Sequence, residues 1–347
     1  MRRTRVLILY NEPTLPRDHP DAESEFEVIY TAEALTNALE PAGFRVQRLG
    51  VGRDPAELLR GLRKARPDVV FNLFEGLGDW GETEAYAVGL LEWLDIPYTG
   101  CPLQPTVLAR NKPLAKKLFV GARLPTAPAV TIDELPVTEL PLAWPVILKP
   151  ATQDASIGID QNSVVTNLEA LKQRAAYLLE AYGPPVLAEE YIDGREFCVG
   201  MIEAPDLRCL PVTEMDFRCE GPGAWPIVTY DAKWKPGTPE YELIPNRPEA
   251  TVGRALTTRM NSLAKRAFRL LGCRDYARVD FRVKPTGKPY ILEVNPNPDI
   301  HPGAGLAHAL EAAGVGWAAF CVGLVERALA RGRRESVRGG MNLMSTE

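Results

Sequence analysis

Four side chains that can bind a cation and an anion stand close together near the C-terminal end of the chain. Arg278 and Asp280 lie on one apolar run. Glu293 and Asn295 lie on a second run, and a Pro-Thr-Gly turn at 285–287 joins the two. Two such runs predict a β-hairpin, and strand alternation then directs all four side chains to one face of the sheet. Neighbouring carboxylates repel each other unless a cation lies between them, and carboxylates with an amide oxygen suit magnesium that also binds nucleotide phosphates. The alternative is an ordinary charged surface hairpin.

A second group of residues has the composition of a nucleotide site. Lys149 ends an apolar run, and the small, polar segment 151–158 that follows ends in glycine. A lysine supplies charge and small residues let backbone amides approach phosphate oxygens, so this segment resembles a phosphate loop. Acidic residues surround a strand between Glu189 and Glu196, where backbone groups can meet an adenine edge and a carboxylate can accept from ribose hydroxyls. The alternatives are a solvated lysine and a charged edge strand.

The elements that must position these residues begin with an alternating pattern. Over the first hundred residues, short β-rich runs alternate with helical periodicity, which predicts a parallel sheet with crossover helices. The expected elements are a strand at 6–10, a helix at 25–42, a strand at 44–49, a helix after 54, a strand at 68–73, a helix at 83–94 and a short strand at 96–100. Loops at the carboxyl ends of such strands line a cleft. Because no Gly-x-Gly-x-x-Gly follows the first strand, a dinucleotide-binding fold is disfavoured.

After residue 102 the pattern becomes mixed. The expected elements are a helix over 112–120, a strand that ends at 149, a helix from a capping box at 166–169 to 181, strands over 186–191, 196–202 and 207–213, a helix over 249–271, the hairpin, and a helix from about 315. Between the last strand and the next helix, residues 214–247 show little periodicity and many prolines and glycines. A segment of that length without regular elements is typical of a functional lid.

The composition excludes several classes of partner. The 347 residues carry 40 basic and 45 acidic side chains, a net charge of −5, which argues against nucleic acid as the main partner. No apolar run approaches the roughly 20 residues of a membrane span, and the short apolar run after Met1 lacks the features of a signal peptide. We therefore expect a soluble, cytoplasmic protein. Six scattered cysteines predict buried thiols, and three histidines are poorly placed for a His-based catalytic site.

Taken together, these motifs resemble those of a known family. The order and spacing of the ATP-grasp fold are found in Lys149-Pro150, the loop to Gly158, Glu189-Glu-Tyr-Ile192, Arg195-Glu196, Tyr230-Asp-Ala-Lys233, Ala277-Arg-Val-Asp280 and Leu292-Glu-Val-Asn295. The chain is similar to the D-alanine:D-alanine ligase branch in particular, because Pro97-Tyr-Thr-Gly100 and Leu124-Pro-Thr-Ala-Pro128 are also typical of that branch. The resemblance implies an α/β and α+β fold, in which a Rossmann-like parallel-sheet (pre-ATP-grasp) domain precedes a two-lobed ATP-grasp fold. The implied division is an N-terminal substrate domain over 1–101, a central lobe over 102–185, a C-terminal lobe with lid and metal site over 186–335, and a tail over 336–347.

The resemblance also implies which residues bind ATP and a metal. Lys112 and Lys149 match the family's residues that bind the phosphates. Glu189 and the backbone of Glu190, Tyr191 and Ile192 match the groups that bind adenine. Glu196 matches the residue that binds the ribose. Magnesium, or manganese in its place, is implied at Asp280, Glu293 and Asn295.

Three further positions match residues that act on the reacting groups in the family. Lys233 matches a lid lysine that reaches the transferred phosphoryl group. Ser156 is what remains of an adjacent serine pair in the phosphate loop, with Ala155 in the other place. Arg278 matches the residue that stabilises the oxyanion of a tetrahedral intermediate; an ion pair with Asp280 is its alternative role.

The departures from the family pattern concentrate at the amino-acid end. The usual Gly-rich turn and Ser-x-Glu after the first strand are missing, and we expect Glu23, or else Glu25 or Glu27, to hold the ammonium group of the first substrate. The His-Gly motif is missing as well, since this chain reads Glu75-Gly there, and Trp234 replaces a loop tyrosine.

Past Asn295, the serine that binds the second substrate's carboxylate is replaced by Ala304. We expect backbone amides of Gly303, Ala304, Gly305 and Leu306 at a helix start to form an anion site in its place. The alternative is a turn that merely begins a helix.

The resemblance therefore implies an ATP-dependent ligase that joins amino acids through an acyl-phosphate intermediate. It also implies a role in the synthesis of cell-wall peptidoglycan. A homodimer is expected by resemblance alone. Two alternatives remain: a ligase of the same chemistry for other amino acids or a carboxylate in a specialised pathway, and a regulatory protein that binds ATP without catalysis.

Overall fold

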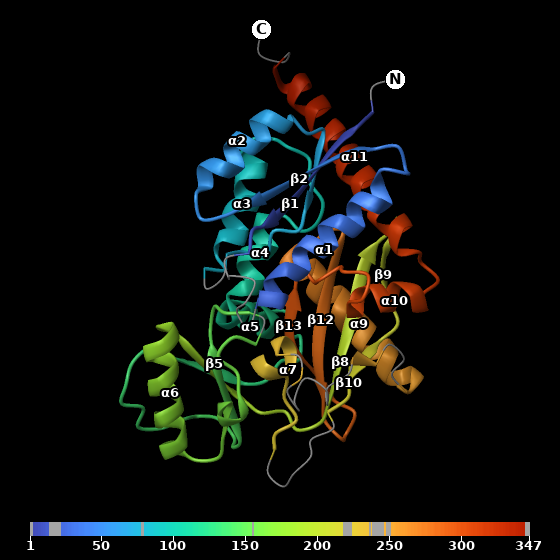
Figure 1. Ribbon diagram of the computed structural model, residues 1–347. Coiled ribbons are helices and arrows are strands. Elements are labelled where there is room, and N and C mark those ends of the chain that lie inside the picture. Colours follow the sequence, from blue (N-terminus) through green and yellow to red (C-terminus); the bar gives the residue numbers. More distant parts are fainter. Residues whose placement is uncertain are drawn as a thin grey trace.

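The residues that the structure describes form three β-sheets (Figure 1). The structure, a computed structural model, describes residues 3–13, 22–77, 80–154, 156–217, 224–235, 237, 246–247 and 251–343. For residues 22–25, 234, 246–247 and 334–343 it describes the backbone alone. The sheets follow one another along the chain, and each has helices packed against it.

The N-terminal sheet is parallel and covered on both faces. Its strands β1 (Arg5–Asn11), β2 (Arg45–Val51) and β3 (Val69–Asn72) pair in the order β2-β1-β3. Val6 and Ile8 of β1 share a core with α1 (Ala22–Leu39) and α11 (Trp317–Leu343), whereas Leu7 and Leu9 share one with α2 (Pro55–Ala65) and α3 (Thr83–Trp93). Because both faces are buried, β1 is apolar at successive positions instead of alternating. The predicted crossover arrangement is therefore present, with α1 beginning three residues earlier than expected.

The central sheet is antiparallel, and a helix packs on one of its faces. Its strands are β4 (Ala129–Ile132), β7 (Val186–Glu190), β5 (Val146–Pro150) and β6 (Val164–Val165), in that order, and α6 (Leu168–Tyr182) packs on it. The helices α4 (Leu103–Arg110) and α5 (Lys112–Gly121) precede the sheet, and a short 3-10 helix spans Gln161–Ser163. The predicted capping box at Thr166 is wrong, because the neighbouring Asn167 caps α6 by accepting from the Ala170 amide. Strand β7, which opens the predicted C-terminal lobe, pairs within this central sheet.

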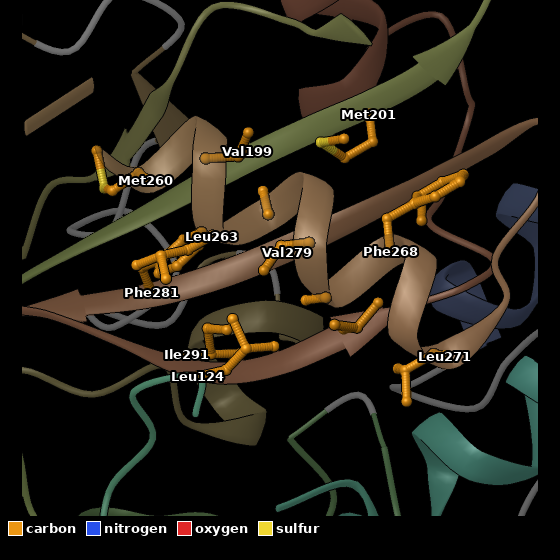
Figure 2. Close-up of a cluster of buried hydrophobic side chains, with 14 of the residues drawn as sticks. Leu124, Val199, Met201, Met260, Leu263, Phe268, Leu271, Val279, Phe281 and Ile291 are labelled. Atoms are coloured by element: carbon orange, nitrogen blue, oxygen red, sulfur yellow. The ribbon is translucent and has the colours of Figure 1, made fainter. Parts of the chain in front are cut away.

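The C-terminal sheet carries the predicted hairpin. Its strands are β11 (Asn246–Arg247), β10 (Thr213–Met215), β8 (Arg195–Glu203), β12 (Tyr276–Val283) and β13 (Pro289–Asn295), in that order, and β9 (Leu207–Cys209) pairs with β8. The amphipathic helix α9 (Arg254–Leu271) covers one face, where Met260, Leu263 and Phe268 pack in one core with Val279 and Phe281 (Figure 2). The opposite face is left for polar side chains.

An ion pair ties the C-terminal helix to the sheets. Asp275 is fully buried, accepts from the Gly100 amide at 2.9 Å, and meets the two terminal nitrogens of Arg331 at 2.7 and 2.8 Å. Helix α11 follows α10 (Gly305–Ala312) and continues to Leu343, so the tail predicted from residue 336 is helical as far as residue 343. Among the described helices, none alone is long and apolar enough to cross a membrane; α10 and α11 to Arg333 reach that length only as a pair bent by 101°.

Candidate active site

A cavity of about 750 Å³ is lined by residues from all three parts of the fold. Its walls include Asn11 at the carboxyl end of β1, Leu73 just after β3, the end of β5, the β12–β13 hairpin, and α7 (Tyr230–Trp234). In Figure 1, α7 lies between the lobe that holds β5 and the strands β12 and β13. The carboxyl ends of the parallel strands thus face the cavity, as expected for this class of sheet.

The hairpin brings its four polar residues onto the cavity wall. Arg278 lies directly opposite Asn295, and Asp280 directly opposite Glu293. All four line the cavity, while the alternate residues Val279 and Phe281 are fully buried in the core with α9. Directly opposite residues share one face of a sheet, so the structure places these side chains as the sequence predicted.

Arg278 and Asp280 form a two-point ion pair. The Nε and Nη2 atoms of Arg278 each donate to a different oxygen of Asp280, both at 2.8 Å. Burial opposes the charge on Arg278, but the Asp280 carboxylate holds the pKa of Arg278 well above its ordinary value. The ion pair with Asp280, the alternative role of Arg278, is therefore present in the structure. Arg278 also lines the cavity, as predicted.

The donor atoms at Asp280, Glu293 and Asn295 have the chemistry of a magnesium site. The Asn295 Oδ1 atom accepts from the Asn297 amide at 2.8 Å, which fixes the orientation of the side-chain amide. Over the part of the chain that the structure describes, no three Asp, Glu, His or Cys side chains gather as a metal site of their own. Two carboxylates and one amide oxygen fit a hard cation that takes its remaining ligands from phosphates and water.

A buried ion triad holds the predicted phosphate lysine. Glu189, 2% exposed, contacts the Nζ atom of Lys149 and lies 2.6 Å from the Nζ atom of Lys116. Lys116 also donates to the Thr126 hydroxyl at 2.8 Å. The sequence analysis missed Lys116, although it follows Lys112 by four residues, and this spacing places both side chains on the same face of α5.

Acid should weaken the fold through Glu189. Burial disfavours its charge, yet Lys116 and Lys149 lower its pKa from 4.5 to about 2. A depressed carboxyl pKa contributes stability above the unfolded-state pKa, and this contribution is lost as pH falls from about 4.5 through about 2. We expect Glu189→Gln to lower the free energy of unfolding by about 3 kcal/mol at neutral pH, and by less at about pH 3.5. Denaturant titrations at both pH values measure this; an equal loss at both would rule out ionisation of Glu189 as the cause.

The segment predicted to bind adenine and ribose also lies on the cavity wall. The amides of Glu190 and Tyr191 donate to the carbonyls of Pro128 and Pro145, both at 2.9 Å. The carboxylate of Glu190 accepts from the Ala143 amide at 2.9 Å. These groups stiffen the segment, and Ile192 follows them along the wall.

Glu196 has a partner that the sequence analysis missed. Its carboxylate lies 2.9 Å from the Nε atom of Arg282, which is 3% exposed and also donates to the carbonyls of Gly194 and Pro226. Arg282 follows Asp280 by two residues, so strand alternation alone places it on the cavity face. It joins the predicted ribose carboxylate to the segment that precedes α7.

The described part of the predicted lid docks on both lobes. Trp225 exchanges hydrogen bonds with the Gln161 side chain at 2.8 and 3.2 Å and stacks edge-on against Tyr191, with ring centroids 5.2 Å apart. The Tyr230 amide donates to the Ile159 carbonyl at 2.9 Å. Lys233 lines the cavity, where desolvation and the positive charge of Arg278 lower its pKa. Trp234 lies at the end of α7, and its side chain is outside the described residues.

The phosphate loop meets Lys112 through an acidic residue. The Nζ atom of Lys112 lies 2.5 Å from the Asp154 Oδ1 atom and 3.7 Å from the Glu293 Oε2 atom. Ser156, which lines the cavity, adopts a φ of 63°, a left-handed conformation that is uncommon for a residue with a side chain. Ala155 lies outside the described residues.

At the amino-acid end the structure places some predicted residues and not others. Ala304 and Gly305 line the cavity, whereas Gly303 does not, and its amide donates to the His301 Nδ1 atom at 3.1 Å. The Ala304 amide is engaged as well, by the His301 carbonyl at 2.8 Å. The expected anion site is therefore reduced to the first amides of α10, those of Gly305 and Leu306. The side chain of Glu23 lies outside the described residues.

Three acidic residues, Glu27, Glu75 and Asp299, face the cavity near that end. One of them, Glu27, is among the glutamates expected from the sequence to hold the ammonium group, whereas Glu75 and Asp299 were not assigned. Desolvation at the cavity wall, followed by the negative charges of Asp299 and Glu84, raises the pKa of Glu75 to about 8. Where the family has its His-Gly motif, this chain reads Glu75-Gly. That departure was the sequence signal that could have identified Glu75 as a cavity residue.

Comparison with known proteins agrees with this geometry. The family model described as D-ala D-ala ligase C-terminus matches residues 125–326. The D-alanine–D-alanine ligase of Gluconobacter oxydans is 33% identical over 306 residues, which cover 87% of this chain and 94% of that protein. That of Granulibacter bethesdensis is 31% identical over 333 residues, with coverage of 94% and 98%.

Solved structures share the whole fold. The D-alanine–D-alanine ligase from Bacillus anthracis complexed with ATP superposes with a TM-score of 0.75 at 19% identity, covering 96% of this chain and 99% of that chain. The enzyme from Coxiella burnetii gives a TM-score of 0.73 at 17% identity, with coverage of 99% of each chain. The fold and the cavity together define an ATP-grasp enzyme, which confirms the predicted fold class. The chain belongs to the D-alanine–D-alanine ligase family, and it is an ATP-dependent, ADP-forming ligase that joins a carboxylate to an amine.

Proposed function

We propose that the protein joins two molecules of D-alanine in the cytoplasm, with Mg²⁺ as its metal, for the synthesis of cell-wall peptidoglycan. The observation that carries the proposal is that Asp280 and Glu293 lie opposite each other on the cavity wall that also holds Lys112, Lys149 and Lys233. A ligase of this kind needs phosphate-binding cations and a metal-binding carboxylate pair around one enclosed space. The names of the relatives supply the choice of D-alanine.

The chemistry requires an activated carboxyl group, because a carboxylate and an amine do not condense in water at neutral pH. Transfer of the ATP γ-phosphoryl group to the first substrate gives an acyl phosphate and ADP; attack by the second amine then forms the peptide bond and releases phosphate. When bound, Mg²⁺ would neutralise charge on the phosphates during transfer, held by Asp280, Glu293 and Asn295.

Each cavity residue has its own role in this reaction. Lys112 and Lys149 attract the phosphates, and Lys233 lies on the lid helix beside the point of transfer. Arg278 stabilises the oxyanion that forms when the amine attacks. The hydrogen bonds of Trp225 and Tyr230 hold the lid segment over the cavity, which keeps water from an acyl phosphate. Ser156 lies on the phosphate loop and lines the same cavity.

A second candidate is a ligase of the same chemistry for other amino acids. It is favoured by the substrate end of the cavity, where Ala304 offers no hydroxyl and the carboxylates Glu27, Glu75 and Asp299 line the wall. The alternative of a regulatory protein that binds ATP without catalysis is not supported, because family membership and the complete set of cavity residues both favour an enzyme.

Release of phosphate from Mg-ATP tests the proposal. Purified protein is given D-alanine, L-alanine, other amino acids singly, and pairs of them, and the products are identified by mass spectrometry. D-Alanyl-D-alanine with D-alanine alone supports the first candidate. Phosphate release only with other substrates supports the second. Absence of phosphate release with every substrate would contradict both.

The first amides of α10 should bind the carboxylate of the second substrate. Gly305 is the first residue of the helix, and Ala304 before it has an extended backbone, with φ −81° and ψ 163°. Proline is well tolerated at a first helical position after such a residue, so Gly305→Pro removes one amide hydrogen without breaking α10. We expect the KM of the second substrate to rise about tenfold, the loss of one charge-assisted hydrogen bond, with little change in the KM of ATP. Gly305→Ala is the control, and equal changes in both KM values would contradict the assignment.

Three further statements stay predictions: the division of the chain at residues 101 and 185, the cytoplasmic location, and a homodimer. Sedimentation of the purified protein measures the last of these directly.

A further inference from the structure

An acidic residue lies in the middle of the phosphate loop, in contact with a lysine that is predicted to bind phosphate. Asp154 stands between Lys149 and Gly158, and its Oδ1 atom lies 2.5 Å from the Nζ atom of Lys112. Lys112 also donates to the Gln153 carbonyl at 2.7 Å, so a phosphate oxygen competes with the Asp154 carboxylate for an ammonium group that already has two partners. A negative charge so close to the phosphates also repels them.

Asp154 has a second basic partner on the opposite side. Its Oδ2 atom lies 3.4 Å from the Nη1 atom of Arg110, which is the last residue of α4. Burial opposes ionisation of Asp154, but Lys112 and Arg110 lower its pKa. The carboxylate is therefore shared between two cations, only one of which is predicted to bind ATP.

Arg110 is held in place independently of the phosphate loop. Its Nη2 atom lies 3.0 Å from the Oε2 atom of Glu84 on α3, and these two side chains are 12% and 9% exposed. Glu84 in turn accepts from the Asn297 side chain at 3.1 Å, just past the hairpin. Arg110 is thus fixed between the N-terminal sheet and the C-terminal sheet, while Asp154 lies on a loop and its side chain is 39% exposed.

Resting on the proposed role of Lys112 at the ATP phosphates, we propose that Asp154 is an exchangeable counter-ion: it partners Lys112, and it passes to Arg110 when a phosphate of ATP takes Lys112. Arg110 is then a positioning residue, since it acts on ATP through Asp154. The exchange needs little movement, because the carboxylate already lies within 3.4 Å of Arg110. Glu84 keeps Arg110 in position to receive it.

The proposal predicts opposite effects for the two members of the pair. Asp154→Asn removes both the competitor and the repulsion, so the Kd of Mg-ATP should fall about three- to tenfold. Arg110→Gln leaves Asp154 on Lys112, so the Kd should rise by a similar factor. In the Asp154→Asn background, Arg110→Gln should have almost no effect on the Kd. Non-additivity of this kind is the signature of two residues that act as a unit.

Calorimetric titration of the full-length protein with Mg-ATP, without an amino acid, measures these constants. AMP is the control ligand, because it lacks the β and γ phosphates and should bind all variants alike. Asp133→Asn, the same change at an exposed position of the central lobe, is the control variant. Thermal unfolding verifies that each variant is folded. If Arg110→Gln does not fold, Arg110→Lys replaces it, with a smaller rise in Kd expected.

Two outcomes would overturn the proposal. Weaker ATP binding by Asp154→Asn would mean that Asp154 itself helps to hold the nucleotide or its metal. If Arg110→Gln raises the Kd of Mg-ATP by the same factor in the unaltered protein and in the Asp154→Asn variant, Arg110 binds ATP directly. Failure of the proposed function is distinct from both, since it would appear as no binding of Mg-ATP by the unaltered protein.

Discussion

Glu293→Gln is expected to lower kcat by on the order of 1000-fold while the protein stays folded, since a metal ligand at a transferring phosphoryl group contributes several kcal/mol. Glu293 lies opposite Asp280 on the cavity wall, and glutamine keeps its shape but removes its charge. The variant loses both the repulsion from Asp280 and the attraction of Lys112 at 3.7 Å, so its stability should change little. The loss of activity would then come from the metal site and not from unfolding.

Steady-state release of phosphate in the presence of Mg²⁺ measures this effect, and thermal unfolding gives the stability. Glu311→Gln is a matched control, because Glu311 is an exposed glutamate on α10, outside the cavity lining. Its kcat should be that of the unaltered protein. Activity of Glu293→Gln near the unaltered level, with Mg²⁺ as the metal, would show that the metal assignment is wrong.

The hairpin could be predicted because its signals are local. Two apolar runs and a turn determine which side chains share a face, and a neighbouring helix with apolar residues at helical spacing covers the other face. The parallel N-terminal sheet was predictable for the same reason. Strand and helix boundaries moved by a few residues where two polar residues compete for one cap, as Thr166 and Asn167 do at α6.

The ion pairs of the cavity could not be predicted in this way. Glu84, Arg110 and Asp154 come from α3, α4 and the phosphate loop, and no local pattern relates residues that only the packing of three sheets brings together. Lys116 and Arg282 are intermediate cases, because helical or strand spacing relates each to a residue that was already assigned. The amino-acid end was least predictable, since this chain departs from its family there. Two of the amides expected to form an anion site at α10, those of Gly303 and Ala304, are hydrogen-bonded to His301 instead.

Arg278 gives the second large effect. Arg278→Ala is expected to lower kcat by about 100- to 1000-fold, the usual cost of removing an oxyanion-stabilising group. Its partner Asp280 would keep its charge and lose a competing cation at 2.8 Å. The metal and Mg-ATP should therefore bind as well as before or better, and the KM of ATP should not rise. Steady-state kinetics, with ATP and each amino acid varied in turn, measure kcat and the KM of ATP separately.

The alternative role of Arg278, an ion pair that holds Asp280 in place, predicts a different pattern. Asp280 would then move when Arg278 is lost, the KM of ATP and the Mg²⁺ requirement would rise, and the free energy of unfolding would fall. Arg278→Lys sharpens the comparison, because a lysine keeps the charge but cannot reproduce the two-point geometry. Partial recovery of kcat in Arg278→Lys, with an unchanged KM for ATP, supports a role at the reacting atoms. A rise in the KM of ATP that matches the fall in kcat would instead assign Arg278 to the support of Asp280.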